Sequence, residues 1–346
     1  MNKDKSLRAY AGMVLLLAAA AFGPKAALGE SSGNYVNKLA GPDGNVMLYA
    51  DTSRGRPFSK DPDVVNFKGK YYMYYSIPPH KDRRLDTGWA IGIARSNDLH
   101  TWKRIGEILG AAEYEKKGLA APAAIVLDGK VHLFYQTYGN GPKDAICHAR
   151  SDDAISFVRD STNPIFAPTG KWNVGRAIDA DVIVDGGRML LYCATRDPEM
   201  KTQMLVVAAA PLGSGFQRDS WKQLWDAPIL KPELAWEKQC IEAPAVCKHD
   251  GRFFMFYAGA YNNQPQQIGC AASDDGIAWK RISNRPLLPN GKPGRWNSSE
   301  SGHPGVFVDH DGETHLFFQG NNDNGKTWYI SKMKVAWKDN IPCLDR

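Results

Sequence analysis

Three carboxylates and one imidazole each open a short apolar segment of this chain. Asp61 and Asp179 lie eight residues before a turn glycine, whereas Glu242 and His303 lie nine residues before one. Two carboxylates can share general acid–base work, one deprotonating water and the other protonating a leaving oxygen. A third carboxylate beside the acid raises its pKa by like-charge repulsion and keeps it protonated. The four residues are therefore candidate site residues, provided that the fold brings them together.

The elements that must position these residues form a repeat. An apolar run, a two-residue turn and a second apolar run occur five times, at residues 61–76, 121–136, 179–194, 242–258 and 303–319. Successive turn glycines are separated by 60, 58, 64 and 61 residues. Glycine-containing turns between runs rich in Val, Ile, Phe and Tyr are typical of β-hairpins, and almost no segment has a helical period. The chain is therefore predicted to be all-β.

A second signature follows three of the hairpins. It contains a Ser-x-Asp triplet and, a few residues later, an aromatic: Ser96 to Trp102, Ser151 to Phe157 and Ser273 to Trp279. The triplet predicts a turn closed by Ser and Asp side chains, and we expect the aromatic to enter a fourth strand and pack between repeats. Four antiparallel strands in each of five units predict a five-bladed β-propeller. A β-sandwich with long hairpins is the alternative, but it does not explain the constant period.

The first strand of each blade lines the central channel of a propeller, so the residues that open the hairpins are expected to face one another. Asp61, Asp179 and Glu242 are then predicted to occupy equivalent positions on blades one, three and four, with Ala121 on blade two and His303 on blade five. Acids on opposite sides of a channel leave room for a water molecule, which is the arrangement that inverting glycosidases need.

The residues around these positions resemble a known family. Asp61-Pro62-Asp63-Val64, Ile178-Asp179-Ala180-Asp181-Val182 and Glu242-Ala243-Pro244-Ala245 are similar to the three acidic motifs of the five-bladed glycoside hydrolases of family 43, in the arabinanase and levansucrase superfamily. The resemblance implies that Asp61 is the general base, that Glu242 is the general acid and that Asp179 tunes the pKa of the acid. Ala180 and Ala243 depart from the family pattern, and Asp63 and Asp181 are rival candidates on the same strand faces.

The resemblance also implies a metal or water cluster in the channel. Ser301-Gly302-His303-Pro304-Gly305 is similar to a blade-five segment of the family whose His helps to hold it, so calcium beside His303 is the expected cofactor. We expect Trp89, Trp172 and Arg176, together with His303, to contact the sugar. Arg196-Asp197-Pro198 matches a tripeptide of fructan-cleaving relatives, but it follows a strand instead of preceding one and is interpreted as a turn.

The N-terminal segment has the features of a secretory signal. A basic start, an apolar run at residues 11–22 and small residues at 27–29 precede Glu30, and the run is too short for a membrane-spanning helix. We therefore predict a signal peptide at 1–29, one propeller domain at 30–346 and a secreted or periplasmic location, without a membrane partner after cleavage. An uncleaved membrane anchor is the alternative.

Net charge and cysteine spacing argue against a nucleic-acid-binding protein and against a zinc site. The formal charge of +6 falls to about +3 without the leader, which is too weak a bias to indicate nucleic acid. The six cysteines include no C-x-x-C pair, which argues against zinc, and four of them lie in strand-like runs where a buried thiol is as plausible as a disulfide.

These observations predict a secreted glycoside hydrolase. The expected substrate is an oligosaccharide or polysaccharide of plants or algae, cleaved at an arabinofuranoside, xyloside or galactoside with inversion. The alternatives are a sialidase-like hydrolase, which would need three arginines and a Tyr nucleophile, and a carbohydrate-binding propeller without catalysis. Three unneutralised carboxylates in one channel favour an enzyme.

Overall fold

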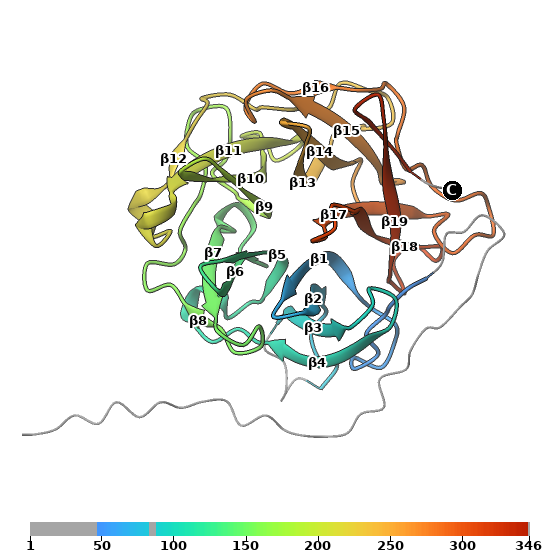
Figure 1. The fold of residues 1–346 in the computed structure, drawn as a ribbon, viewed down its shortest axis with the longest axis horizontal. Helices are drawn as coiled ribbons and strands as arrows, with labels where there is room; N and C mark the ends of the chain where they lie inside the picture. The colour runs from blue at the N-terminus through green and yellow to red at the C-terminus, as the bar shows by residue number, and fades with distance from the viewer. Residues whose placement is uncertain (1–46, 83–87, 345–346) are drawn as a thin grey trace, which may run out of the picture. The chain divides into compact units, whose positions relative to one another are not determined.

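The structure is a computed structural model that describes residues 47–82 and 88–344. The chain divides into two units, Met1–Ser32 and Gly33–Arg346, and the strands of the described residues belong to the second. Twenty strands of this unit form five four-stranded antiparallel sheets, which are arranged as blades around a ring (Figure 1). The predicted five-bladed propeller is confirmed. The predicted leader and its boundary lie outside the described residues.

Each blade runs from an inner strand to an outer one. Blade one contains β1 (Lys60–Phe67), β2 (Lys70–Ile77), β3 (Ala90–Ser96) and β4 (Trp102–Ile108). Blade two contains β5 (Leu119–Leu127), β6 (Lys130–Thr137), β7 (Ile146–Ser151) and β8 (Val158–Arg159). Blade three contains β9 (Ile178–Asp185), β10 (Arg188–Arg196), β11 (Gln203–Pro211) and β12 (Lys222–Gln223).

The last two blades complete the ring. Blade four contains β13 (Ile241–His249), β14 (Arg252–Gly259), β15 (Gln267–Ser273) and β16 (Lys280–Arg281). Blade five contains β17 (Glu300–Val308), β18 (Thr314–Asn321), β19 (Tyr329–Lys338) and β20 (Ile341–Leu344). The described helices are short 3₁₀ turns: η2 (Glu113–Glu115), η3 (Gly141–Lys143), η4 (Leu212–Ser214) and η5 (Arg218–Ser220). Within the described ranges, no helix is long and apolar enough to cross a membrane.

The second strand of each blade is buried on both faces because it packs between neighbouring blades. In β2, Tyr74 and Tyr75 are both fully buried, and the Tyr74 hydroxyl donates to the backbone oxygen of Ala154 in blade two (2.9 Å). In β10, the Tyr192 hydroxyl likewise donates to the backbone oxygen of Gly276 in blade four (2.8 Å). A strand with two packed faces needs apolar residues in succession, which explains why these sequences do not alternate.

The Ser-x-Asp turns form as predicted, and so do the two-residue hairpin turns of blades one to four, whereas residues 309–313 make a longer turn in blade five. Residues 68–69, 128–129 and 250–251 connect first and second strands with positive φ at both positions, the geometry that two-residue hairpins favour. In the turn between β3 and β4, Asp98 Oδ1 accepts from the backbone N–H of His100 (2.8 Å) and Thr101 (2.7 Å). The aromatics after these turns pack against the neighbouring blade, as Trp102 does against Phe317 with ring centroids 6.2 Å apart.

A buried trio of Tyr, carboxylate and Arg recurs in three blades. The tyrosine hydroxyl and the arginine Nε both donate to one carboxylate, in the sets Tyr75–Asp51–Arg104, Tyr135–Glu115–Arg159 and Tyr257–Glu237–Arg281. The tyrosine comes from the second strand, the arginine from the fourth strand, and the acid from the segment before the blade. Each trio therefore joins the entry segment of its blade to the outer strand.

The segment before β1 closes the ring against blade five. The backbone N–H of Ile330 in β19 donates to the oxygen of Tyr49 (2.8 Å), and the N–H of Trp328 donates to the oxygen of Pro57 (3.1 Å). The first described residues are thus anchored on the last blade. The six cysteines, all in the described ranges, are free thiols, and five of them are buried.

Candidate active site

A β-bulge interrupts the first strand of every blade near its start. One residue at each bulge has a φ between 45° and 54°, a conformation that residues other than glycine rarely adopt: Asp61, Ala121, Asp179, Ala243 and His303. The pairing with the second strand shifts at this point in all five blades. These five residues are therefore structurally equivalent, and three of them carry polar side chains.

The structure corrects the predicted position of Glu242. Ala243, not Glu242, is equivalent to Asp61, and Glu242 lies one residue earlier, where blade one has Lys60. The hairpin turn of blade four has the same length as that of blade one, so its nine-residue offset is a shift of one position along the strand. The same offset at His303 has another cause, because the turn of blade five is longer.

Buried side chains from the preceding blade bind the backbone N–H groups at four of the bulges. The pairs are Gln319 Oε1 with Asp61 N (2.9 Å), Ser76 Oγ with Ala121 N (2.8 Å), Gln136 Oε1 with Asp179 N (2.5 Å) and Gln266 Oε1 with His303 N (3.1 Å). A bulge frees an N–H from the strand ladder, and a buried N–H needs a partner. These bonds hold the candidate residues in a strained conformation and at fixed positions between blades.

His303 lies between the two aspartates. Its Nε2 atom is 3.3 Å from Asp61 Oδ1 and 3.4 Å from Asp179 Oδ1, and all three side chains are buried. Burial alone would lower the pKa of His303, but the charges of Asp61 and Asp179 raise it to about 9. Burial alone would raise the pKa of Asp61, but His303 and Lys60 more than offset this effect and lower it. The site therefore holds an ionised Asp61 against an imidazolium.

Glu242 has an environment of the opposite kind. Burial and the charge of Asp179 raise the pKa of Glu242, although hydrogen bonds from amides oppose the shift. Gln266 Nε2 donates to Oε1 (2.6 Å), Gln203 Nε2 donates to Oε2, and Asn262 Nδ2 is 3.5 Å from Oε1. The structure thus gives Asp61 and Glu242 pKa values that are shifted in opposite directions, as an acid and a base require.

Arg196, which the sequence placed in a turn, is connected to Glu242. The turn exists, because Asp197 Oδ1 accepts from the backbone N–H groups of Lys201 (2.7 Å) and Thr202 (3.1 Å). Arg196 itself ends β10 and donates from Nε to Gln203 Oε1 (2.8 Å), and Gln203 binds Glu242. No sequence motif marks Gln203, since its role depends on the packing of β11 against β13.

Two further charged residues that the sequence did not indicate lie in this region. The Lys60 Nζ atom is 3.8 Å from Asp61 Oδ1, and its side chain is 15% exposed. Glu300 is fully buried at the start of β17, where it accepts from Gln319 Nε2 (2.7 Å) and from the backbone N–H of Asn263 (2.6 Å). Burial raises the pKa of Glu300 to about 7. In the sequence, Lys60 is marked only by its equivalence with Glu242, and this equivalence is apparent only when the first strands of the two blades are aligned at their bulges.

The predicted sugar contacts separate into two groups. Trp89 stacks edge-on against Tyr138 with centroids 5.4 Å apart, and the pKa of Tyr138, raised mainly by burial, also responds to the charges of Lys60, Asp61 and Asp179. Trp89 is therefore adjacent to the site.

Arg176 and Trp172 are held by other partners. Arg176 forms a buried ion pair with Asp144 (3.3 Å) and is close enough to Tyr138 to affect its pKa. Trp172 packs against blade three and donates from Nε1 to Asp226 (3.2 Å). Within the described residues, no contact joins Trp172 to the three acids, so the structure does not bring it into the cluster.

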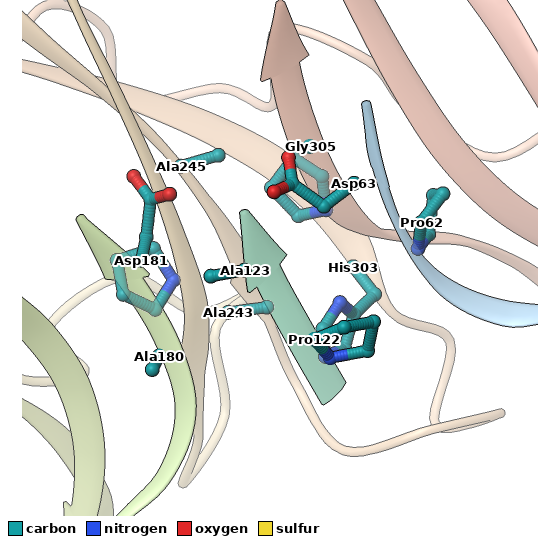
Figure 2. Close-up of a pocket in the computed structure, with 12 residues that line it drawn as sticks. Pro62, Asp63, Pro122, Ala123, Ala180, Asp181, Ala243, Ala245, His303 and Gly305 are labelled. Atoms are coloured by element: carbon teal, nitrogen blue, oxygen red, sulfur yellow. The ribbon is translucent and has the colours of Figure 1, made fainter. Parts of the chain in front are cut away.

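The rival aspartates line the channel cavity. Asp63 and Asp181 share this cavity with His303, and Figure 2 shows their carboxylates turned away from the His303 ring. Asp63 Oδ2 accepts from the backbone N–H of Ala124, and Asp181 Oδ2 accepts from that of Val246 (2.6 Å), so each acid joins its blade to the next. Burial raises the pKa of both, to about 7 for Asp181. Their carboxylates bind the backbone of a neighbouring blade, whereas those of Asp61 and Asp179 pair with His303.

A calcium site is not preformed in the described part of the chain. It contains no group of three His, Cys, Asp or Glu side chains arranged to hold a metal ion. The side-chain donors that line the cavity are one imidazole and two aspartates that already accept backbone N–H groups, whereas calcium prefers six to eight oxygen ligands. These residues alone do not fit a directly bound calcium ion.

Comparisons with known proteins agree with this architecture. The family model described as glycosyl hydrolases family 43 matches residues 54–342, which include Asp61, Asp179, Glu242 and His303. A thermostable family-43 glycoside hydrolase has a TM-score of 0.66 and 20% identity, and the match covers 86% of this chain and 96% of that one.

Two further solved structures share the fold. An endo-1,4-β-xylanase from Bacteroides thetaiotaomicron has a TM-score of 0.63 and 22% identity over 83% of this chain and 94% of that one. An α-L-arabinofuranosidase from Lactobacillus brevis has a TM-score of 0.63 and 18% identity over 83% and 93%. Similarity at this level of identity concerns the fold.

Proposed function

The chain belongs to glycosyl hydrolase family 43, and we propose that it hydrolyses an arabinofuranoside, xyloside or galactoside of plant or algal oligosaccharides or polysaccharides. The observation that carries the proposal is the buried cluster of Asp61, Asp179, Glu242 and His303 at the inner strands of four blades. Within this cluster, one carboxylate is held ionised and another is held toward its protonated form.

Asp61 acts as the general base. The imidazolium of His303 and the ammonium of Lys60 stabilise its charged form, so it can accept a proton from a water molecule near neutral pH. The hydrogen bond that its backbone N–H donates to Gln319 Oε1 helps to fix the position of the residue. The proton of the attacking water thus moves to Asp61 as the water oxygen bonds to the anomeric carbon.

Glu242 acts as the general acid. Burial and Asp179 favour its protonated form, and it gives the proton to the glycosidic oxygen as that bond breaks. Gln203, Gln266 and Asn262 can then donate to the carboxylate that remains. Asp179 acts on this step through its charge and does not need to touch the reacting atoms.

The reaction proceeds with inversion. The base and the acid come from blades one and four, which are separated by blade five in the ring, and we place the attacking water between the two groups. Calcium beside His303 stays a prediction from the family resemblance, and no step of this mechanism depends on it. A secreted or periplasmic location rests on the sequence of residues 1–29.

A panel of nitrophenyl glycosides and of plant and algal oligosaccharides tests this function. We expect turnover of at least one arabinofuranoside, xyloside or galactoside, and proton NMR of the first sugar released should show the inverted anomer. Retention of configuration would overturn the assignment of Asp61 as a base. Hydrolysis of sialosides alone, or binding of polysaccharide without hydrolysis, would support the two competing functions instead.

A further inference from the structure

Lys60 occupies a distinctive position in the ring. It lies one residue before the bulge of blade one, and the equivalent residues of the other blades are Ala120, Ile178, Glu242 and Gly302. Lys60 and Glu242 are thus the two charged side chains among five equivalent positions. Glu242 is the proposed acid, so Lys60, which holds the equivalent position on blade one, is a candidate for contact with the same ligand.

The Lys60 ammonium is shielded but has unused hydrogen-bonding capacity. Its Nζ atom is 4.7 Å from the centre of the Trp328 ring and 3.8 Å from Asp61 Oδ1, so the ammonium is paired with Asp61. An ammonium group has three N–H donors, and a single carboxylate at this distance does not satisfy all of them. A ligand in this pocket can therefore accept hydrogen bonds from the remaining donors.

The charges around Lys60 favour an uncharged ligand. Lys60 and the imidazolium of His303 balance Asp61 and Asp179, while the raised pKa values of Glu242 and Glu300 favour their neutral forms. No positive charge is left over to compensate an additional anion. A sugar carboxylate or sulfate would therefore be repelled by Asp61, whereas a hydroxyl oxygen can accept from Lys60 without adding charge.

We propose that Lys60 is a specificity-determining residue that donates hydrogen bonds to hydroxyl oxygens of an uncharged sugar bound between Asp61 and Glu242. This inference rests on the proposed function for the location of the sugar. It adds a substrate contact on blade one that is separate from the acid, the base and the residue that tunes the acid.

Binding of free sugars tests the inference without requiring turnover. Isothermal titration calorimetry would measure the affinity of arabinose, xylose, galactose and galacturonate for the wild type, for Lys60→Met and for Lys68→Met. Methionine keeps the apolar stem of the side chain and removes its charge and donors. Lys68 is the matched control, since it lies on the same hairpin, has its own cation–π contact with Phe67 and is exposed.

We expect Lys60→Met to lower the affinity for the neutral sugar that binds most tightly by about 10 to 100-fold, the usual range for a hydrogen bond from a charged donor. Lys68→Met should leave this affinity unchanged. Unchanged binding by Lys60→Met would overturn the contact. Preference for galacturonate over galactose, or failure of every neutral sugar to bind the wild type, would overturn the inference that the ligand is uncharged.

Failure of the inference and failure of the proposed function remain distinguishable. Sugar binding that depends on Lys60 in a protein that cleaves no glycoside would support the inference and contradict hydrolysis. If Lys60→Met does not fold, Lys60→Arg provides a second test, because it keeps the charge but moves the donors. Lys60→Arg should bind the neutral sugar more weakly than the wild type, whereas Lys68→Arg should not. Equal affinities of the two arginine variants for this sugar would contradict a directed contact.

Discussion

Glu242 must be protonated to act as the acid and Asp61 must be ionised to act as the base, so mutations can separate the two roles. Glu242→Gln removes the proton donor but keeps the amide-lined pocket formed by Gln203 and Gln266. We expect kcat to fall by about 10² to 10⁴-fold on a substrate with a poor leaving group, the usual scale for acid catalysis. On a dinitrophenyl glycoside the loss should be much smaller, because this leaving group departs without a proton. Steady-state kinetics on both substrates would measure the difference.

Asp61→Asn provides the matching control for this experiment. Activation of water is needed with every leaving group, so we expect this variant to be impaired equally on both classes of substrate. A Glu242→Gln enzyme that loses the same factor on both classes would contradict its assignment as the acid. A larger loss for Asp61→Asn on the poor leaving group alone would suggest that the two roles are exchanged.

The acidic residues of the site were visible in the sequence, but their partners were not. Asp61, Asp179 and Glu242 could be predicted because each precedes a hairpin whose turn glycine marks its place in the repeat. The one-residue error at Glu242 concerns its offset from the turn glycine, which is nine residues whereas that of Asp61 is eight, and because the two turns have the same length the bulge falls at Ala243. Lys60 and Gln203 could not be predicted, since their contacts cross between strands whose relative position is set by packing.

At the scale of elements, the trio of blade four tests how strongly a blade depends on its entry segment. Glu237 is fully buried, and Arg281 donates to it from Nε (2.7 Å) and Nη2 (2.8 Å). Arg281→Ala would leave this buried carboxylate without its counter-charge, and we expect the free energy of unfolding to fall by roughly 3 kcal/mol, at the low end for a broken buried pair because the arginine is partly exposed. Urea denaturation would measure the change.

Arg252→Ala is a matched control in the same blade. Arg252 pairs with Asp274 (2.8 Å), but both side chains are largely exposed, at 49% and 85%. Exposed pairs contribute little, so we expect a loss below about 1 kcal/mol. Similar losses for the two variants would show that the trio is not a determinant of blade stability. The trio was not predictable from the repeat, since its three members lie far apart in sequence and blades three and five lack an equivalent in the described contacts.

At the scale of the whole molecule, the period near 60 residues was sufficient to predict the propeller. A ring of blades needs repeated hairpins with two buried faces, and both features are present in the sequence. The closure of the ring was not predicted. It includes backbone hydrogen bonds of Ile330 with residues 48–49 and of Trp328 with Pro57 and Ser59, and this entry segment belongs to no repeat.

The junction between blades two and three gives the ring a specific sensitivity to acid. His132 Nδ1 and His148 Nε2 are 3.0 Å apart in a stacked, buried pair that packs against Phe216 of blade three. Burial and the neighbouring His132 lower the pKa of His148 to about 3, with Arg150 adding to the shift and Asp160 opposing it, while burial and Arg150 lower the pKa of His132. Both imidazoles are thus neutral in the folded protein near pH 7.

The sign of the pH dependence follows from these shifts. An unfolded histidine has a pKa near 6.5, so between pH 7 and pH 5 the unfolded chain binds a proton at His148 that the folded chain does not, and stability falls. The raised pKa values of Asp181 and Glu300 act in the opposite direction over the same range, because the folded protein binds their protons more tightly. The pH dependence of the free energy of unfolding of the wild type therefore combines the contributions of several groups. Comparison with a variant at His148 isolates the contribution of this histidine.

We expect His148→Gln to be less stable than the wild type at pH 7, because it loses a packed aromatic contact with Phe134, and to be less sensitive to acid. From pH 7 to pH 5, the free energy of unfolding of the wild type should fall by on the order of 2 kcal/mol more than that of the variant, the value expected for a single imidazole with this shift. Urea denaturation at several pH values between 5 and 7 would measure both curves. Parallel curves would mean that His148 is already protonated in the folded ring, and the neutral pair at this junction would then be the wrong description.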